Sequence, residues 1–596
     1  MSGRGEKDLL SYYQAELSDL REAGVEFARE HPGVARRLEL ERDESPDPHV
    51  ERLIESFAYL TARIQQQLDD EFPDAAAALL GVLYPHYTAP TPSTTVARFR
   101  VLEGQGKLTT GHGIRRGTPL VAHAPDGLLC RFRTCYPVTL WPVTVESAAI
   151  ESADRVAAPR GTQSILRIRM RGWGESPPRP DSLCFYLGHE LRSGAALYEL
   201  LFAQATGVYV RSGETGALIP LPADSLRPVG FRRDEAMLYA PEHAHPAYRL
   251  LQEYFVNPHK FLFAEFTNLK AFVPPGPEWE LIVPLRRPAP EWLRVSRDSF
   301  QLGCTPIINL FDRLTEPIRV DQRRSEYRLV PDVRRTTTTE VHTILKVSAS
   351  SDPKNEAATY QPLYSFSHGN PARAYWNARR VPTPSRSVAG TDVLLSFVDL
   401  DFNPAFPSER TVWAHTLCTN RNLAEQLPPG QFLEIEESAP LHGIDVLHTP
   451  TLQRDPPMAG ATLWRLVSQL SLNHLSLEGP AGLRTLQEML RLYNAAYGSP
   501  GSEQQASGVT GIECRRVVRR AGHGEWRGMC RGTEITLTFD ETCFAGTRAF
   551  LLASVLRHFL GLYAPINSFT QTIARGPEAG EEWKAWPPLT GEQSVL

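Results

Sequence analysis

The first ninety residues of the chain place apolar side chains at the three- and four-residue steps of an amphipathic helix. One such pattern runs over 9–27 and ends at a His-Pro-Gly sequence. A second begins at Asp47 and Pro48, residue types suited to a helix cap and to a first turn. Its apolar stripe consists of Val50, Leu53, Ile54, Phe57, Leu60, Ile64 and Leu68. With a third, shorter helix over 74–84, the pattern predicts a three-helix head.

This head is small for a domain with its own core. Three helices joined by short loops bury little apolar surface, so we expect the head to complete its core by packing on something else. Pro85, Pro90 and Pro92 follow closely, and aromatic side chains flank the first of them. We interpret this proline-rich sequence as a stiff joint between the head and the rest of the chain.

After the joint, the period of the pattern changes to two. Segments such as TTVARFRV, LLCRFRT and SILRIRM alternate apolar and polar residues, and Gly- and Pro-rich turns separate them. The alternation predicts a β-rich, sandwich- or barrel-like region to about position 455, with a helical insert over 245–266. The last part is mixed: we expect helices over 461–477, 481–497 and 546–563, and a strand pair over 511–520 and 532–540.

These elements indicate a multidomain protein of the α+β class. At roughly 150 residues per domain, the length of 596 residues allows three or four domains. We expect a helical domain over 1–90, a first β-rich domain over 91–240, a second β-rich domain with a helical insert over 241–455, and a mixed C-terminal domain over 456–596.

Composition and charge narrow the class of partner. The formal net charge is −5, and no block of like charges is present, so we expect no nucleic-acid partner and no direct membrane insertion. The eight cysteines are scattered without a CxxC pair, which is typical of reduced thiols in a cytoplasmic protein. The amino terminus lacks the apolar stretch of a cleavable signal.

A search for catalytic motifs returns only weak candidates. The Gly-rich turn over 102–110 carries Lys107 but departs from the phosphate-loop pattern. His243 and His245 lie in a proline-flanked loop, and no HExxH or GxSxG sequence occurs. The acidic run at 69–71 fits a solvated helix end. We therefore expect no catalytic, cofactor-binding or metal-binding residue, and no enzymatic activity.

One segment, 308–335, combines aromatic residues with a high density of charge. Its arginines Arg319, Arg323, Arg324 and Arg328 could bind acidic groups on a partner, because arginine is favoured at protein interfaces. They could equally be the solvent faces of two strands. The sequence leaves both interpretations open.

Several stretches of the chain resemble the TssF family, also called VasA or ImpG, of the bacterial type VI secretion system. They include YYQAELSDLREAGVEFAREHPGVARRL, LLGVLYPHYTAPTPS, LLQEYFVNPHKFLF, NLFDRLTEPI, LWRLVSQLSLNHLSL and VLRHFLGLYAPINSFTQ, in this order between positions 9 and 571. The resemblance places Leu83, Tyr84 and Tyr87 where the helical head meets the first strand, and we expect these residues to contact a partner.

The resemblance implies a structural role without catalytic residues. A TssF-like protein forms cytoplasmic baseplate wedges with TssG and a further TssF copy. The wedges surround the VgrG spike, contact TssK and TssE, and dock at the inner membrane through the assembled baseplate. A ligand- or carbohydrate-binding β-sandwich protein is the alternative. The scattered positions of the tryptophans, which include Trp141 and Trp173, suggest no aromatic-lined pocket for it. A hydrolase is a third possibility.

Overall fold

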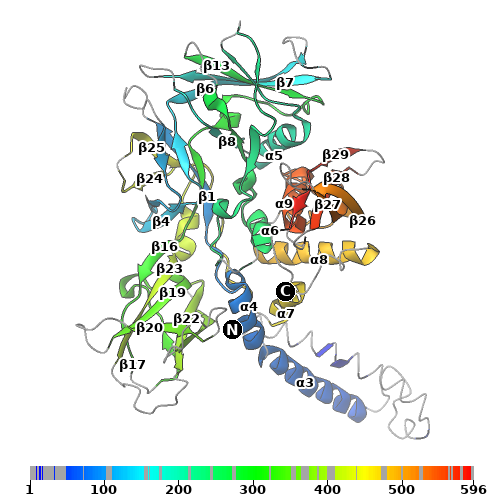
Figure 1. Cartoon of the computed structure of the whole chain (residues 1–596). Coiled ribbons are helices and arrows are strands. Elements are labelled where there is room, and N and C mark those ends of the chain that lie inside the picture. The colour runs from blue at the N-terminus through cyan, green and yellow to red at the C-terminus, as the bar shows by residue number, and fades with distance from the viewer. Residues whose placement is uncertain are drawn as a thin grey trace. The chain divides into compact units, whose positions relative to one another are not determined.

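The structure is a computed structural model of the whole chain, shown in Figure 1. Before position 48 it describes only residues 9, 13, 14, 16, 17, 20 and 33. From 48 to 591 it describes the chain apart from 72, 102–110, 154–158, 160, 174–177, 189, 213–215, 242–243, 245, 272–276, 321–323, 351–357, 364–374, 385–387, 399–409, 438, 459, 471–478, 499–500, 522–527, 562–563, 565–567 and 577–580.

The chain divides into two compact units. Unit 1 comprises 1–83 and 457–471, and unit 2 comprises 84–456 and 472–596. The expected division into four domains stays a prediction.

Unit 1 is helical. Helices α3 (Pro48–Glu71) and α4 (Pro73–Leu83) match the second and third predicted helices, while the predicted cap Asp47 lies outside the described residues. The described residues between 9 and 20 are also helical. Helix α4 packs against α7 (Gly460–Leu470), which comes from the far end of the chain. Ala76, Leu80, Leu463 and Leu466 are buried in these two helices. The head therefore recruits a helix that local sequence patterns could not assign to it.

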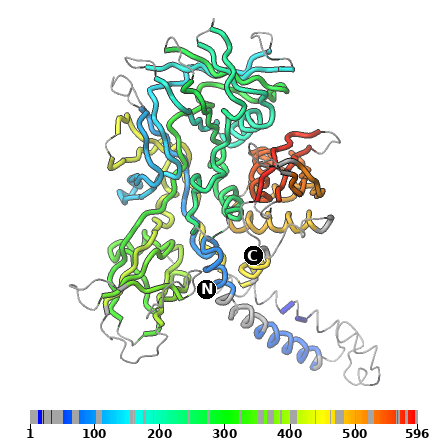
Figure 2. The backbone as a smooth tube through the Cα atoms, viewed as in Figure 1, coloured from blue at the N-terminus to red at the C-terminus, as the bar shows by residue number. Residues whose placement is uncertain are grey.

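Unit 2 contains a closed six-stranded barrel. Its strands run in the order β1 (Thr94–Val101), β15 (Cys304–Ile308), β4 (Leu129–Thr134), β3 (Pro119–His123), β24 (Phe432–Ile435) and β25 (Leu441–Val446). Figure 2 shows β1 and β25 side by side although they are far apart in sequence, and β25 pairs with β1 in antiparallel register. In β4, Cys130 and Phe132 point into the barrel core while the arginines between and after them are more exposed.

Four further sheets of unit 2 surround or extend this barrel along the chain. One has the order β10 (Ile219–Pro220), β9 (Tyr209–Ser212), β13 (Glu278–Leu285), β7 (Ser164–Gly172), β6 (Val143–Ser152). A second has β11 (Leu226–Val229), β12 (Phe263–Phe266), β8 (Leu183–Leu187), β14 (Phe300–Gln301). The largest has β16 (Phe311–Leu314), β23 (Arg410–Thr419), β19 (Glu340–Ser350), β20 (Ala358–Pro362), β21 (Tyr375–Pro382), β22 (Thr391–Val398), β18 (Tyr327–Arg328), with β17 (Ile318–Val320) on β23. The short strands β2 (His112–Ile114) and β5 (Val138–Leu140) pair with each other.

The C-terminal part of unit 2 is mixed, as the sequence predicts. Its sheet has the order β26 (Val509–Ala521), β27 (Gly528–Phe539), β28 (Ser568–Arg575), β29 (Glu582–Ala585), with β30 (Leu589–Thr590) on β28. Helix α8 (Gly479–Tyr497) packs on β26, and α9 (Ala549–Gly561) packs on β28. Helices α5 (Leu191–Glu199) and α6 (Pro246–Val256) contact α9. Together these elements confirm the α+β fold class.

The predicted helical insert over 245–266 is wrong in its second half. Helix α6 ends at Val256, and a short 3₁₀ turn over Pro258–Phe261 leads into strand β12. Pro258 has no backbone N–H to continue the helix, and the Asn257 side chain accepts a hydrogen bond from the backbone N–H of His259 at 3.2 Å. The asparagine and the proline therefore stop α6 in spite of the apolar residues that follow.

The predicted joint is packed inside unit 2. The ring of Tyr84 meets that of Tyr248 on α6 edge to face, with centroids 5.2 Å apart. After the 3₁₀ turn Pro85–Tyr87, the hydroxyl of Tyr87 is hydrogen bonded to that of Tyr493 on α8. Tyr87 is only 1% exposed. Aromatic contacts to two helices thus fix the start of unit 2.

The helical head should not fold by itself. A fragment that ends near Arg98 contains α3 and α4 but lacks α7, so α4 loses the apolar surface against which it packs. We expect the fragment to melt without a cooperative transition in circular dichroism, whereas the full chain melts cooperatively. A cooperative melt of a monomeric fragment would contradict this view of the head.

His86 should make the chain sensitive to acid. Burial, assisted by the positive charge of Arg249, lowers the pKa of His86 from 6.5 to about 3. Between pH 6.5 and about 3, His86 is protonated in the unfolded chain but neutral in the folded chain. The free energy of unfolding therefore falls by about 1.4 kcal/mol per pH unit as the pH drops from 6.5 towards 3. We expect His86→Phe to narrow the difference in melting temperature between about pH 7.5 and about pH 5. The variant should remove only part of this difference in melting temperature, because burial also lowers the pKa of His342 and of His558 to about 3.

The matched control is His415→Phe, at an exposed histidine of β23. If both variants, or neither, narrow the difference, the acid sensitivity does not arise at His86.

Candidate interaction surfaces

Helix α3 carries four large apolar side chains that the described residues of unit 1 leave mostly exposed. They are Leu53, Phe57, Leu60 and Ile64, which are 69%, 61%, 55% and 59% exposed. Steps of four, three and four residues place all four on one face of the helix. We call this set the α3 stripe. Contiguous exposed apolar surface of this kind marks an interaction site on a folded protein.

The buried side of α3 carries small side chains instead of large ones. Ala58 and Ala62 have no exposed surface, so the helix approaches its neighbours through small side chains. Ile54 is half-buried, and the side chains of Val50 and Leu68 lie outside the described residues. Most of the stripe that the sequence predicts as a core face is therefore not buried within unit 1. Exposed Leu79 on α4 and Trp464 on α7 add apolar surface to the same unit.

The residues predicted for partner contact at the joint differ in accessibility. Leu83, the last residue of α4, and Tyr84 are half-buried. Tyr87 is buried, and its hydroxyl already has a hydrogen-bond partner in Tyr493. The structure therefore gives Tyr87 a role within unit 2, and a partner contact at the joint stays a prediction.

The arginine segment is largely exposed to solvent. Arg319 on β17, Arg324 before β18 and Arg328 on β18 are exposed, and Arg323 lies outside the described residues. The guanidinium of Arg328 forms an ion pair with Asp392 of β22 at 3.0 Å, so this arginine is partly used within its own sheet. Partner binding by this segment is untested and stays a prediction.

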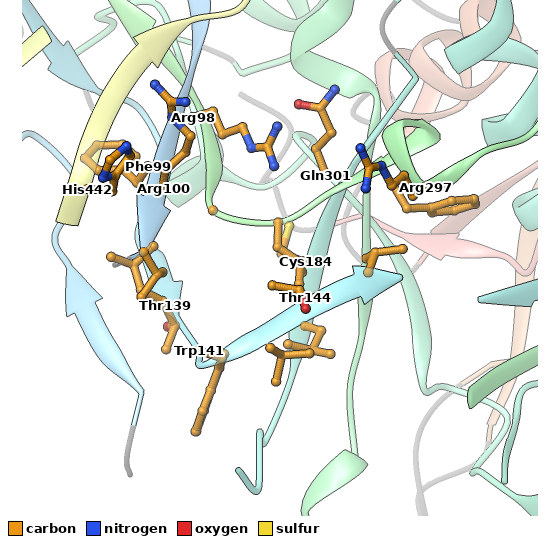
Figure 3. Close-up of a pocket in the computed structure, with 18 of the residues that line it drawn as sticks. Arg98, Phe99, Arg100, Thr139, Trp141, Thr144, Cys184, Arg297, Gln301 and His442 are labelled. Atoms are coloured by element: carbon orange, nitrogen blue, oxygen red, sulfur yellow. The ribbon is translucent and has the colours of Figure 1, made fainter. Parts of the chain in front are cut away.

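The described part of unit 2 also holds a pocket that sequence reasoning missed. Trp141 and Trp173, which the sequence separates, line one cavity of about 450 Å³ together with Arg98, Arg100 and Arg297, as Figure 3 shows for the labelled residues. The expectation that the tryptophans form no pocket is therefore wrong for these two. The consecutive strands β6 and β7 bring them together, since Val143 pairs with Gly172 and the backbone N–H of Trp173 donates to the carbonyl oxygen of Pro142 at 3.0 Å.

The described residues carry little that resembles catalytic chemistry. Among them, no group of three or more His, Cys, Asp or Glu side chains could hold a metal ion. Burial raises the pKa of the Cys130, Cys135 and Cys304 thiols to about 12, which keeps them protonated and poorly nucleophilic at neutral pH. No helix in the described ranges is long and apolar enough to cross a membrane.

Comparison with known proteins places the chain in a family. The family described as "Type VI secretion system, TssF" matches residues 5–593. The type VI secretion system component TssF1 of Pseudomonas aeruginosa is 38% identical over 616 aligned positions, which cover 97% of this chain and 98% of the relative.

Two solved structures share the fold. One chain of a TssK-TssF-TssG baseplate subcomplex matches with a TM-score of 0.72 and 24% identity, covering 92% of this chain and 99% of that one. One chain of a type VI secretion baseplate complex matches with a TM-score of 0.56 and 23% identity, covering 98% and 100%. The resemblance seen in the sequence is thus confirmed over nearly the whole length, and the chain belongs to the TssF family of the type VI secretion system.

Proposed function

We propose that the chain is a structural subunit of the type VI secretion baseplate, and that helix α3 docks onto helices of TssG. Membership of the TssF family places the chain in this secretion system. The observation that carries the docking proposal is the α3 stripe, an apolar helix face that the described part of unit 1 leaves mostly exposed. In this proposal the chain acts by holding its partners in a fixed arrangement, and it catalyses no reaction.

The α3 stripe has the properties of half an interhelical core. Full burial of one Leu, Ile or Phe side chain is worth about 1.5–3 kcal/mol relative to water, so four such residues represent a large unrealised stabilisation. Their four-three-four spacing is the one by which helices pack side by side. An amphipathic helix of the partner would therefore fit this face, and one structural relative is a chain of a subcomplex that contains TssG.

Further contacts of the wedge are part of the same proposal. A further copy of this chain, TssK, TssE and the VgrG spike are its other partners, and the assembled baseplate docks the cytoplasmic chain at the inner membrane. Leu83 and Tyr84 are candidates for contacts next to the head. Arg319, Arg323, Arg324 and Arg328 are candidates for binding acidic groups, since charged arginines add specificity at an interface.

The first test is assembly. Co-expression with a TssG homologue from the same genome, followed by size exclusion with light scattering, should give a stable complex heavier than one-to-one. At high concentration the chain alone should self-associate through its exposed apolar surface. A well-behaved monomer that ignores TssG would count against the proposed function.

The second test is the double variant Phe57→Ser and Leu60→Ser. Both side chains are mostly exposed in the free chain, so we expect the free energy of unfolding to change by less than about 0.5 kcal/mol. Affinity for the TssG homologue should fall by at least about a hundredfold, because two apolar contacts leave the centre of the interface. Pull-down measures the change in affinity for the TssG homologue, and calorimetry measures the change in the free energy of unfolding.

The control for this variant is Arg63→Ala, an exposed residue of α3 that lies outside the α3 stripe. It should leave the complex intact. Equal binding by the control and the double variant would show that TssG does not dock on the α3 stripe.

A further inference from the structure

The pocket in unit 2 is lined by strands of four sheets. Figure 3 shows its labelled residues: Arg98 from β1, Thr144 from β6, and Gln301 from β14, with Arg297 and Trp141 beside them. All of these elements belong to unit 2. The cavity of about 450 Å³ is within the size range of a binding site for a few residues of peptide or a small ligand.

The lining has an excess of positive charge. Three arginines line the pocket and no carboxylate does. Arg100 is compensated, because its Nε lies 2.7 Å from Oδ1 of Asp445. Arg297 lies 3.8 Å from the carboxylate of Asp298, and both of these side chains are largely in solvent. Two or three positive charges facing a cavity favour an anionic group.

Several buried polar groups of the pocket lack a partner among the described residues. Gln301 is 6% exposed; its amide nitrogen donates to the carbonyl oxygen of Asp298 at 3.2 Å, while its Oε1 accepts nothing. The indole N–H groups of Trp141 and Trp173 are also buried and unpaired. These three atoms have almost no accessible surface, so recognition of a ligand in the cavity rests on the arginines and on backbone groups rather than on them.

The pocket is also bounded by strand edges. Strand β6 is the last strand of its five-stranded sheet, and β14 is the last of its four-stranded sheet. Val143, Thr144 and Val145 of β6 line the cavity. An edge strand offers backbone N–H and C=O groups to an added extended segment, and the pockets beside it select the side chains of that segment.

We propose that this pocket binds a short extended peptide segment of a partner protein that carries an Asp or Glu side chain. The carboxylate binds between Arg98 and Arg297, which flank Gln301 in Figure 3. The peptide backbone pairs with the edge of strand β6. The apolar lining from Phe99, Leu140 and Phe300 accepts a neighbouring apolar side chain. This inference does not depend on docking at helix α3.

The test is fluorescence anisotropy on the full chain with a labelled hexapeptide of alternating Glu and Val. The matched peptide of alternating Gln and Val is the first control. We expect the Glu peptide to bind at least about tenfold more tightly, and its affinity to fall with added salt, because guanidinium–carboxylate contacts carry the difference. Equal affinities of the two peptides, or no binding of the Glu peptide, would overturn the proposal.

Variants locate the binding. Arg98→Gln and Arg297→Gln should each weaken binding of the Glu peptide by about tenfold or more. Arg171→Gln is the matched control, because this arginine is exposed on β7 and does not line the pocket. Arg297 is 70% exposed at its side chain, so its variant keeps the test valid even if Arg98→Gln fails to fold.

A competition experiment distinguishes a pocket that binds a peptide from one that binds any small anion. Sodium acetate and inorganic phosphate should displace the labelled Glu peptide only at concentrations far above that of unlabelled Glu peptide. Displacement by either salt at a similar carboxylate or phosphate concentration would show that the pocket binds small anions, and would overturn the peptide assignment. If Arg171→Gln weakens binding of the Glu peptide as much as Arg297→Gln does, the peptide does not bind in this pocket.

Discussion

The packing of helix α3 is the constraint on which the rest of this protein depends. The helix presents alanines to its own unit and leucine, isoleucine and phenylalanine to the outside. A head of this size has too little core to leave four large apolar residues in water without consequence. The stability of the head is therefore linked to its contacts with other proteins, as expected for a component of an assembly.

Unit 2 has the opposite character. Its barrel is closed, its C-terminal sheet is covered by α8 and α9, and the chain that enters it is held by aromatic contacts at Tyr84 and Tyr87. Buried ion pairs reinforce it: Glu253, with no exposed surface, pairs with Lys260 and accepts hydrogen bonds from the backbone N–H groups of Met237 and Leu238 at 2.8 Å. A buried carboxylate with these partners in place holds α6 and the neighbouring segments of unit 2 in one arrangement.

Local periodicity predicted most of the helices and many of the strands, because a stripe or an alternation is a property of neighbouring residues. Helices α3, α4, α8 and α9 begin and end near their expected positions, and the family was correctly identified. Sequence alone could not show which elements pair across long distances. It therefore missed the closure of the barrel by β24 and β25 and the recruitment of α7 to the head. It also predicted the apolar face of α3 and that the head would complete its core on something else, but not which of the apolar residues the described part of unit 1 leaves exposed.

Hydrogen exchange of helix α3, measured by mass spectrometry in the free chain and in its complex with a TssG homologue, tests the central claim most directly. Amides of 48–71 should exchange quickly in the free chain, where little apolar packing opposes local opening, and at least about a hundredfold more slowly in the complex. The segment 84–92, already packed inside unit 2, should change little and serves as the internal reference. Equal protection of α3 in the free and bound chain would contradict the claim that a partner completes the core of the head.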